Sequence, residues 1–190
     1  NLIAWIEFNV LISKIFLKKN FKSRLALSLF KILSLLYLSL FSVLVFNGIT
    51  YAEPSFKLNM VYLFSICICS DVGGLIFGKL FKGKKLTTIS PNKTISGSLG
   101  SFILSVSLVP IFYYLNGESY NLLHLIVLAI SVSLSCQLGD LLISFLKRKA
   151  NVKDTGDLLP GHGGVLDRID GILLAMPIGI LLWKFFITTI

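Results

Sequence analysis

Charged side chains are scarce in this sequence, and acidic ones especially so. Only 14% of its 190 residues are Asp, Glu, Lys or Arg, and nine acids stand against 18 bases. Soluble domains average about 25% charged and roughly 45–50% apolar residues, whereas 55% of this chain is apolar. The composition therefore excludes an ordinary soluble domain and predicts a protein that crosses a membrane several times.

Cysteine is also rare, and all three cysteines lie in apolar stretches. Cys67 and Cys69 are separated by one residue, which is not the two-residue spacing of a zinc or redox pair. We therefore expect Cys67, Cys69 and Cys136 to be ordinary buried thiols. Glycine-rich phosphate loops of the nucleotide-binding kinds are missing as well.

Long apolar runs predict an all-α fold, a polytopic transmembrane helical bundle with about six spans. A spanning helix needs roughly 20 apolar residues. Residues 2–17 are fewer and include two charges, so they fit either the end of a span or a helix lying in the membrane interface. The other predicted spans are 25–46, 58–80, 96–115, 122–146 and 170–190.

The predicted division of the chain is an N-terminal transmembrane region, residues 1–56, and a catalytic transmembrane domain, residues 57–190. The sequence begins with Asn1 rather than Met, and no signal pattern precedes its first apolar segment. We therefore expect the N-terminal region to be truncated, with earlier helices missing.

Basic residues mark one side of the predicted bundle. Three segments hold 14 of the 18 Lys and Arg residues: 18–24, 79–93 and 147–168. The turns at 47–57 and 116–121 hold one. Because basic loops stay in the cytoplasm, the three basic segments are predicted to be cytoplasmic, with Asp71 and Asp140 at the same face.

Residues 144–170, which we call the polar segment, interrupt this apolar chain with five Lys or Arg and four Asp. Asp140, Ser144 and Lys147 are spaced to share one face at the end of a helix. Asp167 and Asp170 are spaced to share one face at the start of the next helix. Carboxylates from two helix ends form a hard oxygen site of the kind that holds Mg²⁺ with substrate phosphates. Acidic side chains that can bind a metal ion, together with basic side chains that can bind phosphate, predict phosphoryl or nucleotidyl transfer to a lipid.

Single residues among these acids and bases can also be explained without an active site. Any one basic residue is also explained by topology or by contact with anionic lipid. Asp71 alone is also explained by a hydrogen bond between helices. For His162 we favour contact with substrate over metal ligation.

The residues of the polar segment follow a specific spacing. They read Ser144-x-x-Lys147-Arg148-(four residues)-Lys153-Asp154-x-Gly156-x-x-Leu159-Pro160-x-His162-Gly163-Gly164-x-x-Asp167-Arg168-x-Asp170. This arrangement closely resembles the signature of the phosphatidate cytidylyltransferases, the CDP-diacylglycerol synthases, which corresponds here to residues 144–171. More than a dozen positions agree, so chance agreement is negligible.

The resemblance extends upstream of the signature. Three stretches resemble further family motifs: Gly139-Asp140-Leu141, Ser90-Pro91-x-Lys93-Thr94, and Asp71 with Gly78-Lys79. The sequence departs from the usual family residues at five positions: Gly74, Leu75, Ile95, Ser96 and Gly171. These departures concern nucleotide or lipid preference more than reaction type.

The resemblance implies a nucleotidyltransferase that joins CTP and phosphatidic acid into CDP-diacylglycerol and pyrophosphate. Asp140 and Asp167 are then expected to hold Mg²⁺, supported by Asp170 and Asp154, and a second monovalent or divalent cation is left open. The expected catalytic residues are Asp140, Lys147, Arg148, Asp167 and Arg168. The expected substrate-binding residues are Asp71, Lys79, Lys93, Thr94, Ser144, Lys153, His162, Gly163 and Gly164.

The expected partners are CTP, phosphatidic acid and membrane lipids, with no nucleic acid and with a homodimer left open. The expected location is a bacterial inner membrane, with the active site facing the cytoplasm. A related membrane nucleotidyl- or phosphotransferase acting on another lipid is the main alternative. An ion or substrate transporter and a non-catalytic assembly partner are further alternatives.

Overall fold

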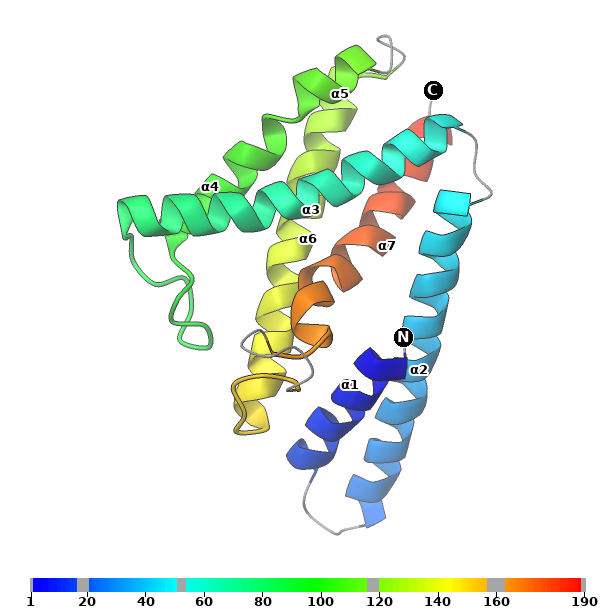
Figure 1. Cartoon of the computed structure of the whole chain (residues 1–190), viewed down its shortest axis with the longest axis vertical. Coiled ribbons are helices and arrows are strands. Elements are labelled where there is room, and N and C mark those ends of the chain that lie inside the picture. The colour runs from blue at the N-terminus through cyan, green and yellow to red at the C-terminus, as the bar shows by residue number, and fades with distance from the viewer. Residues whose placement is uncertain (1, 17–20, 51–53, 116–119, 157–162, 189–190) are drawn as a thin grey trace.

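Seven α-helices and the loops between them make up the described part of the chain. The computed structural model describes residues 2–16, 21–50, 54–115, 120–156 and 163–188 (Figure 1). The helices are α1 (Leu2–Ile15), α2 (Phe21–Thr50), α3 (Pro54–Phe81), α4 (Ile95–Val106), α5 (Val109–Leu115), α6 (Leu122–Lys149) and α7 (Leu166–Thr188). These ranges contain no named β-strand, and the predicted all-α class is confirmed.

Among the described residues, five helical segments are long and apolar enough to cross a membrane. They are Arg24–Thr50, Phe56–Phe81, Ile95–Leu115, Leu122–Lys149 and Leu166–Phe186. Helix α1, which has 14 residues, is not among these five, and the two alternatives for residues 2–17 stay open. At about 1.5 Å per residue, α1 is roughly 21 Å long, and the hydrocarbon core of a bilayer is about 30 Å thick.

Two predicted boundaries are corrected. The expected turn at 47–57 is partly helical, because α2 continues to Thr50 and α3 begins at Pro54, a residue favoured at the first helical position. The predicted span at 96–115 is confirmed as Ile95–Leu115, but the single helix expected there is divided into α4 and α5. Pro110 has no N–H to donate to the carbonyl of Val106, so the helical hydrogen bonding is interrupted there.

Buried apolar side chains gather in two clusters. The larger joins α3, α5, α6 and α7, and its fully buried members include Leu63, Ile66, Leu128, Val132 and Met176. The smaller joins α1, α2, α6 and α7 through Ala4, Leu38, Ile143, Leu166 and Leu173. In Figure 1, α6 and α7 run side by side, α3 crosses them, and α1 pairs with α2.

Helices α3 and α4 approach each other through glycines, as the sequence predicts for Gly97 and Gly100. A Cβ atom added at Gly73 would lie 2.5 Å from the Gly100 carbonyl oxygen, and one at Gly97 would lie 2.7 Å from that of Gly74. Only glycine permits such contact between backbones. This packing holds the start of α4, and the loop that precedes it, against α3.

Candidate active site

Glycines also bring the C-terminal half of α6 against the first turns of α7. A Cβ atom at Gly139 would lie 2.6 Å from the Asp170 carbonyl oxygen, and one at Gly171 would lie 2.5 Å from Cys136 Sγ. Asp140 follows Gly139 and Asp170 precedes Gly171, so the close approach carries both acids to one place. Their carboxylates interact electrostatically.

Asp71 of α3 adds a third carboxylate. It interacts electrostatically with both Asp140 and Asp170, and its Oδ1 accepts a hydrogen bond from Cys136 Sγ at 3.7 Å. The structure therefore brings Asp71 and Asp140 together, as the sequence predicts, although they are far apart in the chain. Like charges this close repel unless cations offset them.

Lys93 supplies one of the offsetting charges. Its Nζ forms an ion pair with Asp140 Oδ2, and it also interacts electrostatically with Asp71. The loop that carries Lys93 folds back on itself, because Leu86 N donates a hydrogen bond to the Lys93 carbonyl oxygen at 2.7 Å. The sequence predicts that Lys93 and Asp140 belong to one site, and the structure places them in contact.

Thr94 and Ser144, both predicted to contact substrate, have hydrogen-bond partners in the protein. The Thr94 side chain accepts a hydrogen bond from Gly97 N at 3.1 Å and so caps the start of α4. Ser144 Oγ donates to Asp140 Oδ1 at 3.4 Å. Substrate contact by either residue stays a prediction.

Lys147 and Asp167 form the second ion pair of the site. Lys147 Nζ lies 2.7 Å from Asp167 Oδ1, and the side chains are only 13% and 9% exposed. Asp167 Oδ2 accepts hydrogen bonds from Thr155 N (2.8 Å), Thr155 Oγ1 (2.9 Å) and Gly164 N (3.0 Å). Asp167 thus joins the end of α6, the loop after it and the start of α7.

The two glycines before α7 leave room for this carboxylate. Gly163 has a φ of +79°, which glycine adopts easily, and a Cβ atom there would lie 2.8 Å from Asp167 Oδ2. A Cβ atom at Gly164 would lie 2.4 Å from Thr155 Oγ1. Both glycines are therefore needed for the backbone to fold closely around Asp167. Contact of Gly163 or Gly164 with substrate stays a prediction.

The remaining predicted site residues lie at the surface. Five are exposed: Lys79, Arg148, Lys153, Asp154 and Arg168. Within the described ranges, Arg148 has no ion-pair partner. His162 lies outside the described residues.

The donor chemistry of the site fits a divalent cation. We call Asp71, Asp140 and Asp170 the carboxylate cluster. Lys93 pairs with Asp140 and Lys147 interacts with Asp170, so three carboxylates face two lysines and oxygen donors remain in excess. No group of three or more His, Cys, Asp or Glu among the described residues is arranged to hold a metal ion. Mg²⁺ commonly binds one or two carboxylates and completes its shell with water and substrate phosphates, so the residues present fit an ion that arrives with a nucleotide.

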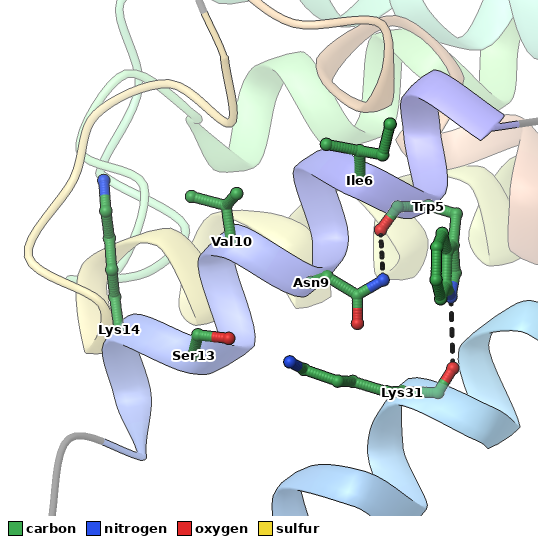
Figure 2. Close-up of a pocket in the computed structure, with 7 residues that line it drawn as sticks. All are labelled: Trp5, Ile6, Asn9, Val10, Ser13, Lys14 and Lys31. Atoms are coloured by element: carbon green, nitrogen blue, oxygen red, sulfur yellow. Dashed lines mark hydrogen bonds between the residues drawn. The ribbon is translucent and has the colours of Figure 1, made fainter.

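A groove of about 490 Å³ between α1 and α2 is separate from these residues (Figure 2). Trp5, Asn9 and Lys31 line it with four other residues. Trp5 Nε1 donates a hydrogen bond to the Lys31 carbonyl oxygen at 3.1 Å, and Asn9 Nδ2 donates to the Trp5 carbonyl oxygen at 2.8 Å. None of the predicted site residues lines this groove.

Glu7 is the residue at this site that the sequence interpretation missed. It lies in α1 and is only 7% exposed, and it accepts a hydrogen bond from Thr155 Oγ1 at 3.2 Å. The available signal was a single acid in an apolar segment, in a chain that has only nine acids. Cys136 is a buried free thiol, as the sequence predicts, and it also contacts Asp71.

Three proteins similar to this chain are all named phosphatidate cytidylyltransferase. A phosphatidate cytidylyltransferase of Rickettsia bellii (strain RML369-C) is 44% identical over 64% of this chain and 55% of its own length. One of Rickettsia typhi (strain ATCC VR-144 / Wilmington) is 40% identical over 72% of this chain and 62% of its own length. One of Bacillus subtilis (strain 168) is 34% identical over 82% of this chain and 66% of its own length. The chain thus spans between about half and two thirds of the length of these relatives.

The sequence also matches a family model over nearly its whole length. The match covers residues 1–186, from α1 through most of α7. It therefore includes the carboxylate cluster, both lysine partners and Glu7. The resemblance found in the signature residues is confirmed, and the chain belongs to the cytidylyltransferase family.

Proposed function

We propose that this chain transfers the cytidylyl group of CTP to phosphatidic acid, giving CDP-diacylglycerol and pyrophosphate. The observation that carries the proposal is the meeting of three carboxylates from α3, α6 and α7 beside two lysines. The carboxylates are those of Asp71, Asp140 and Asp170, and the lysines are Lys93 and Lys147. The names of the similar proteins support the same substrates. The apolar spans support a substrate that stays in the membrane.

In the proposed reaction, a phosphate oxygen of phosphatidic acid attacks the α-phosphorus of CTP. The new bond joins that oxygen to the α-phosphorus, and the bond from the α-phosphorus to the bridging oxygen breaks. That oxygen keeps the electron pair and leaves with pyrophosphate. Because the attacking group is already an anion at neutral pH, positioning and charge stabilisation matter more than proton removal.

The chain's own residues then have two tasks. Lys93, Lys147, Arg148 and Arg168 are proposed to offset the negative charge of the triphosphate and of the lipid phosphate. Asp140 and Asp167, supported by Asp170 and Asp154, are proposed to hold Mg²⁺. When bound, Mg²⁺ supplies positive charge to the phosphate oxygens. Asp167 keeps the start of α7 tied to the loop after α6 through Thr155 and Gly164.

The test of the proposal is an assay of the purified protein with labelled CTP. Phosphatidic acid is offered in one arm and isoprenoid alcohols in the other. Labelled CDP-diacylglycerol in the first arm supports the proposal. Product only with the alcohols would favour the alternative, a related transferase that acts on another lipid.

Replacing Arg148 by lysine should lower kcat/KM at least about tenfold, equivalent to roughly 1.4 kcal/mol of transition-state stabilisation. Arg148 is exposed at the end of α6, and its planar guanidinium can bind phosphate through two parallel hydrogen bonds, which lysine cannot. Kinetics in detergent with both substrates varied would measure the loss.

The same substitution keeps the count of basic residues unchanged, so membrane insertion should be normal. Wild-type kinetics for Arg148→Lys would show that this residue contributes to topology rather than to phosphate binding.

Cysteines introduced at Lys84 and Lys149 should react with an impermeant thiol reagent only after cells are opened. Those introduced at Glu53 and Glu118 should react in intact cells. We expect this pattern from the distribution of basic residues, and it would support a proposed active site at the cytoplasmic face, where CTP is available. The background has Cys67, Cys69 and Cys136 replaced by alanine. Labelling of position 149 from outside intact cells would contradict the orientation.

A further inference from the structure

The carboxylate of Glu7 reaches from α1 into the loop that carries the family signature. Its Oε1 accepts a hydrogen bond from Val165 N at 3.0 Å, and its Oε2 accepts one from Leu166 N at 2.8 Å. Glu7 is 148 residues before Thr155 in the chain, and it also accepts a hydrogen bond from the Thr155 hydroxyl. A buried acid with this many donors is held in place for a reason beyond packing.

The two backbone contacts cap a helix. Leu166 is the first residue of α7, and the first N–H groups of a helix have no partner within it. A side chain of the preceding residues usually accepts these bonds, but here the cap comes from a different helix. The negative charge of Glu7 also suits the positive end of the α7 dipole.

Glu7 and Asp167 hold the same piece of backbone from two sides. The Thr155 hydroxyl lies 3.2 Å from Glu7 Oε2 and 2.9 Å from Asp167 Oδ2. It has one proton, so it serves one carboxylate at a time and keeps the two close. Glu7 binds Val165 and Leu166, which follow the Gly164 that binds Asp167.

Small residues make room for the Glu7 carboxylate. A Cβ atom at Gly164 would lie 2.5 Å from Glu7 Oε2, and one at Gly156 would lie 2.9 Å from Glu7 Oε1. These two glycines stand at positions of the family signature. Because these glycines have no side chains, the Glu7 carboxylate of α1 can approach the loop. Gly164 also leaves room for the contacts of Asp167.

We propose that Glu7 is a positioning residue for nucleotidyl transfer: by holding the backbone at Thr155 and at Gly164–Leu166, it fixes the Asp167 carboxylate that pairs with Lys147. The inference rests on the proposed function. Glu7 does not touch the substrates and acts through Asp167. Its loss therefore lowers kcat more than it raises the KM for either substrate.

The test compares Glu7→Gln with Leu11→Ala in the same helix. Glutamine keeps the shape of Glu7 but turns an NH₂ group toward backbone donors. Leu11 is 1% exposed and absent from the contacts above, so its truncation loosens the packing of α1 without removing any of these hydrogen bonds. We expect Glu7→Gln to lower kcat at least about tenfold with each KM changed less than about threefold. We also expect amide exchange at Val165 and Leu166 to rise at least about tenfold.

Leu11→Ala should lower thermal stability and leave the kcat of the folded enzyme near the wild-type value. An equal loss of kcat in Leu11→Ala, or unchanged kcat and amide protection in Glu7→Gln, would overturn the proposal. A wild-type chain that forms no CDP-diacylglycerol would overturn the proposed function instead. Amide exchange would then still decide whether Glu7 holds the start of α7.

Discussion

Asp140→Asn should reduce formation of CDP-diacylglycerol at least about a thousandfold, close to background. Asparagine keeps the size of the side chain, but it removes the charge that pairs with Lys93 and that interacts with Asp71 and Asp170. It also removes a proposed Mg²⁺ ligand. Loss of one preorganised charge-stabilising group commonly costs a factor of about 10²–10³, and Asp140 is proposed to serve two such roles. Steady-state kinetics at saturating CTP would measure the loss.

The same variant should stay folded in the membrane. The Lys93 and Asp140 side chains are 26% and 30% exposed, and partly exposed ion pairs contribute roughly 0–1 kcal/mol to stability. Size-exclusion elution and the thermal midpoint in detergent should therefore match those of the wild type within a few degrees.

A double variant separates catalysis from ion pairing. Lys93→Met with Asp140→Leu removes the ion pair as a unit and leaves no lone charge from it. If the pair only stabilises the fold, the double variant should regain activity that Asp140→Asn lacks. Under the proposed function, both variants are inactive. Recovery of turnover in the double variant would contradict the assignment of Asp140 to the active site.

The spans could be predicted from the sequence because hydropathy and length are local properties. Runs such as 122–146 exceed the thickness of a bilayer, and the corresponding helix, α6, was expected within three residues at its C-terminal end. The separation of α4 from α5 was missed, although Pro110 stands where the hydrogen bonding is interrupted. Hydropathy alone does not detect this interruption, since both halves are apolar.

The acids of the site could be predicted because each is costly in an apolar chain. Asp71, Asp140 and Asp170 lie in three different spans, and their charges have few uses there other than meeting one another and a cation. The lysine partners were harder to assign. Lys93 and Lys147 belong to basic segments that also determine topology, and only the fold shows which lysine pairs with which acid.

Glu7 could not be placed from the sequence, because its partners are backbone groups. An N–H group at the start of a helix belongs to every sequence, so no residue type marks Val165 or Leu166 as the partners of an acid in α1. The same holds for Gly171, which departs from the usual family residue. A glycine is needed at this position because α7 contacts Cys136 of α6 there, and only the packing shows this contact.

Lys147→Met should lower kcat/KM at least about a hundredfold and should also lower the thermal midpoint. Lys147 and Asp167 are mostly buried, and removing one partner of a buried ion pair costs roughly 3–5 kcal/mol. Part of that cost is avoided here, because Asp167 keeps three hydrogen-bond donors from Thr155 and Gly164. Enough folded Lys147→Met protein should therefore remain for the assay. The loss of kcat/KM should exceed what the unfolded fraction explains.

Lys149→Met is the matched control for that change. Lys149 lies two residues after Lys147 on the same helix and is exposed. Its Nζ lies 5.4 Å from the centre of the Phe145 ring. Both substitutions remove one positive charge from the same basic segment, so they affect topology and anionic-lipid binding equally. If both variants lost activity to the same extent, the count of basic residues would be the cause, and the pair with Asp167 would have no special part. A large loss confined to Lys147→Met, with normal insertion of both variants, would place the cause in the contact between Lys147 and Asp167.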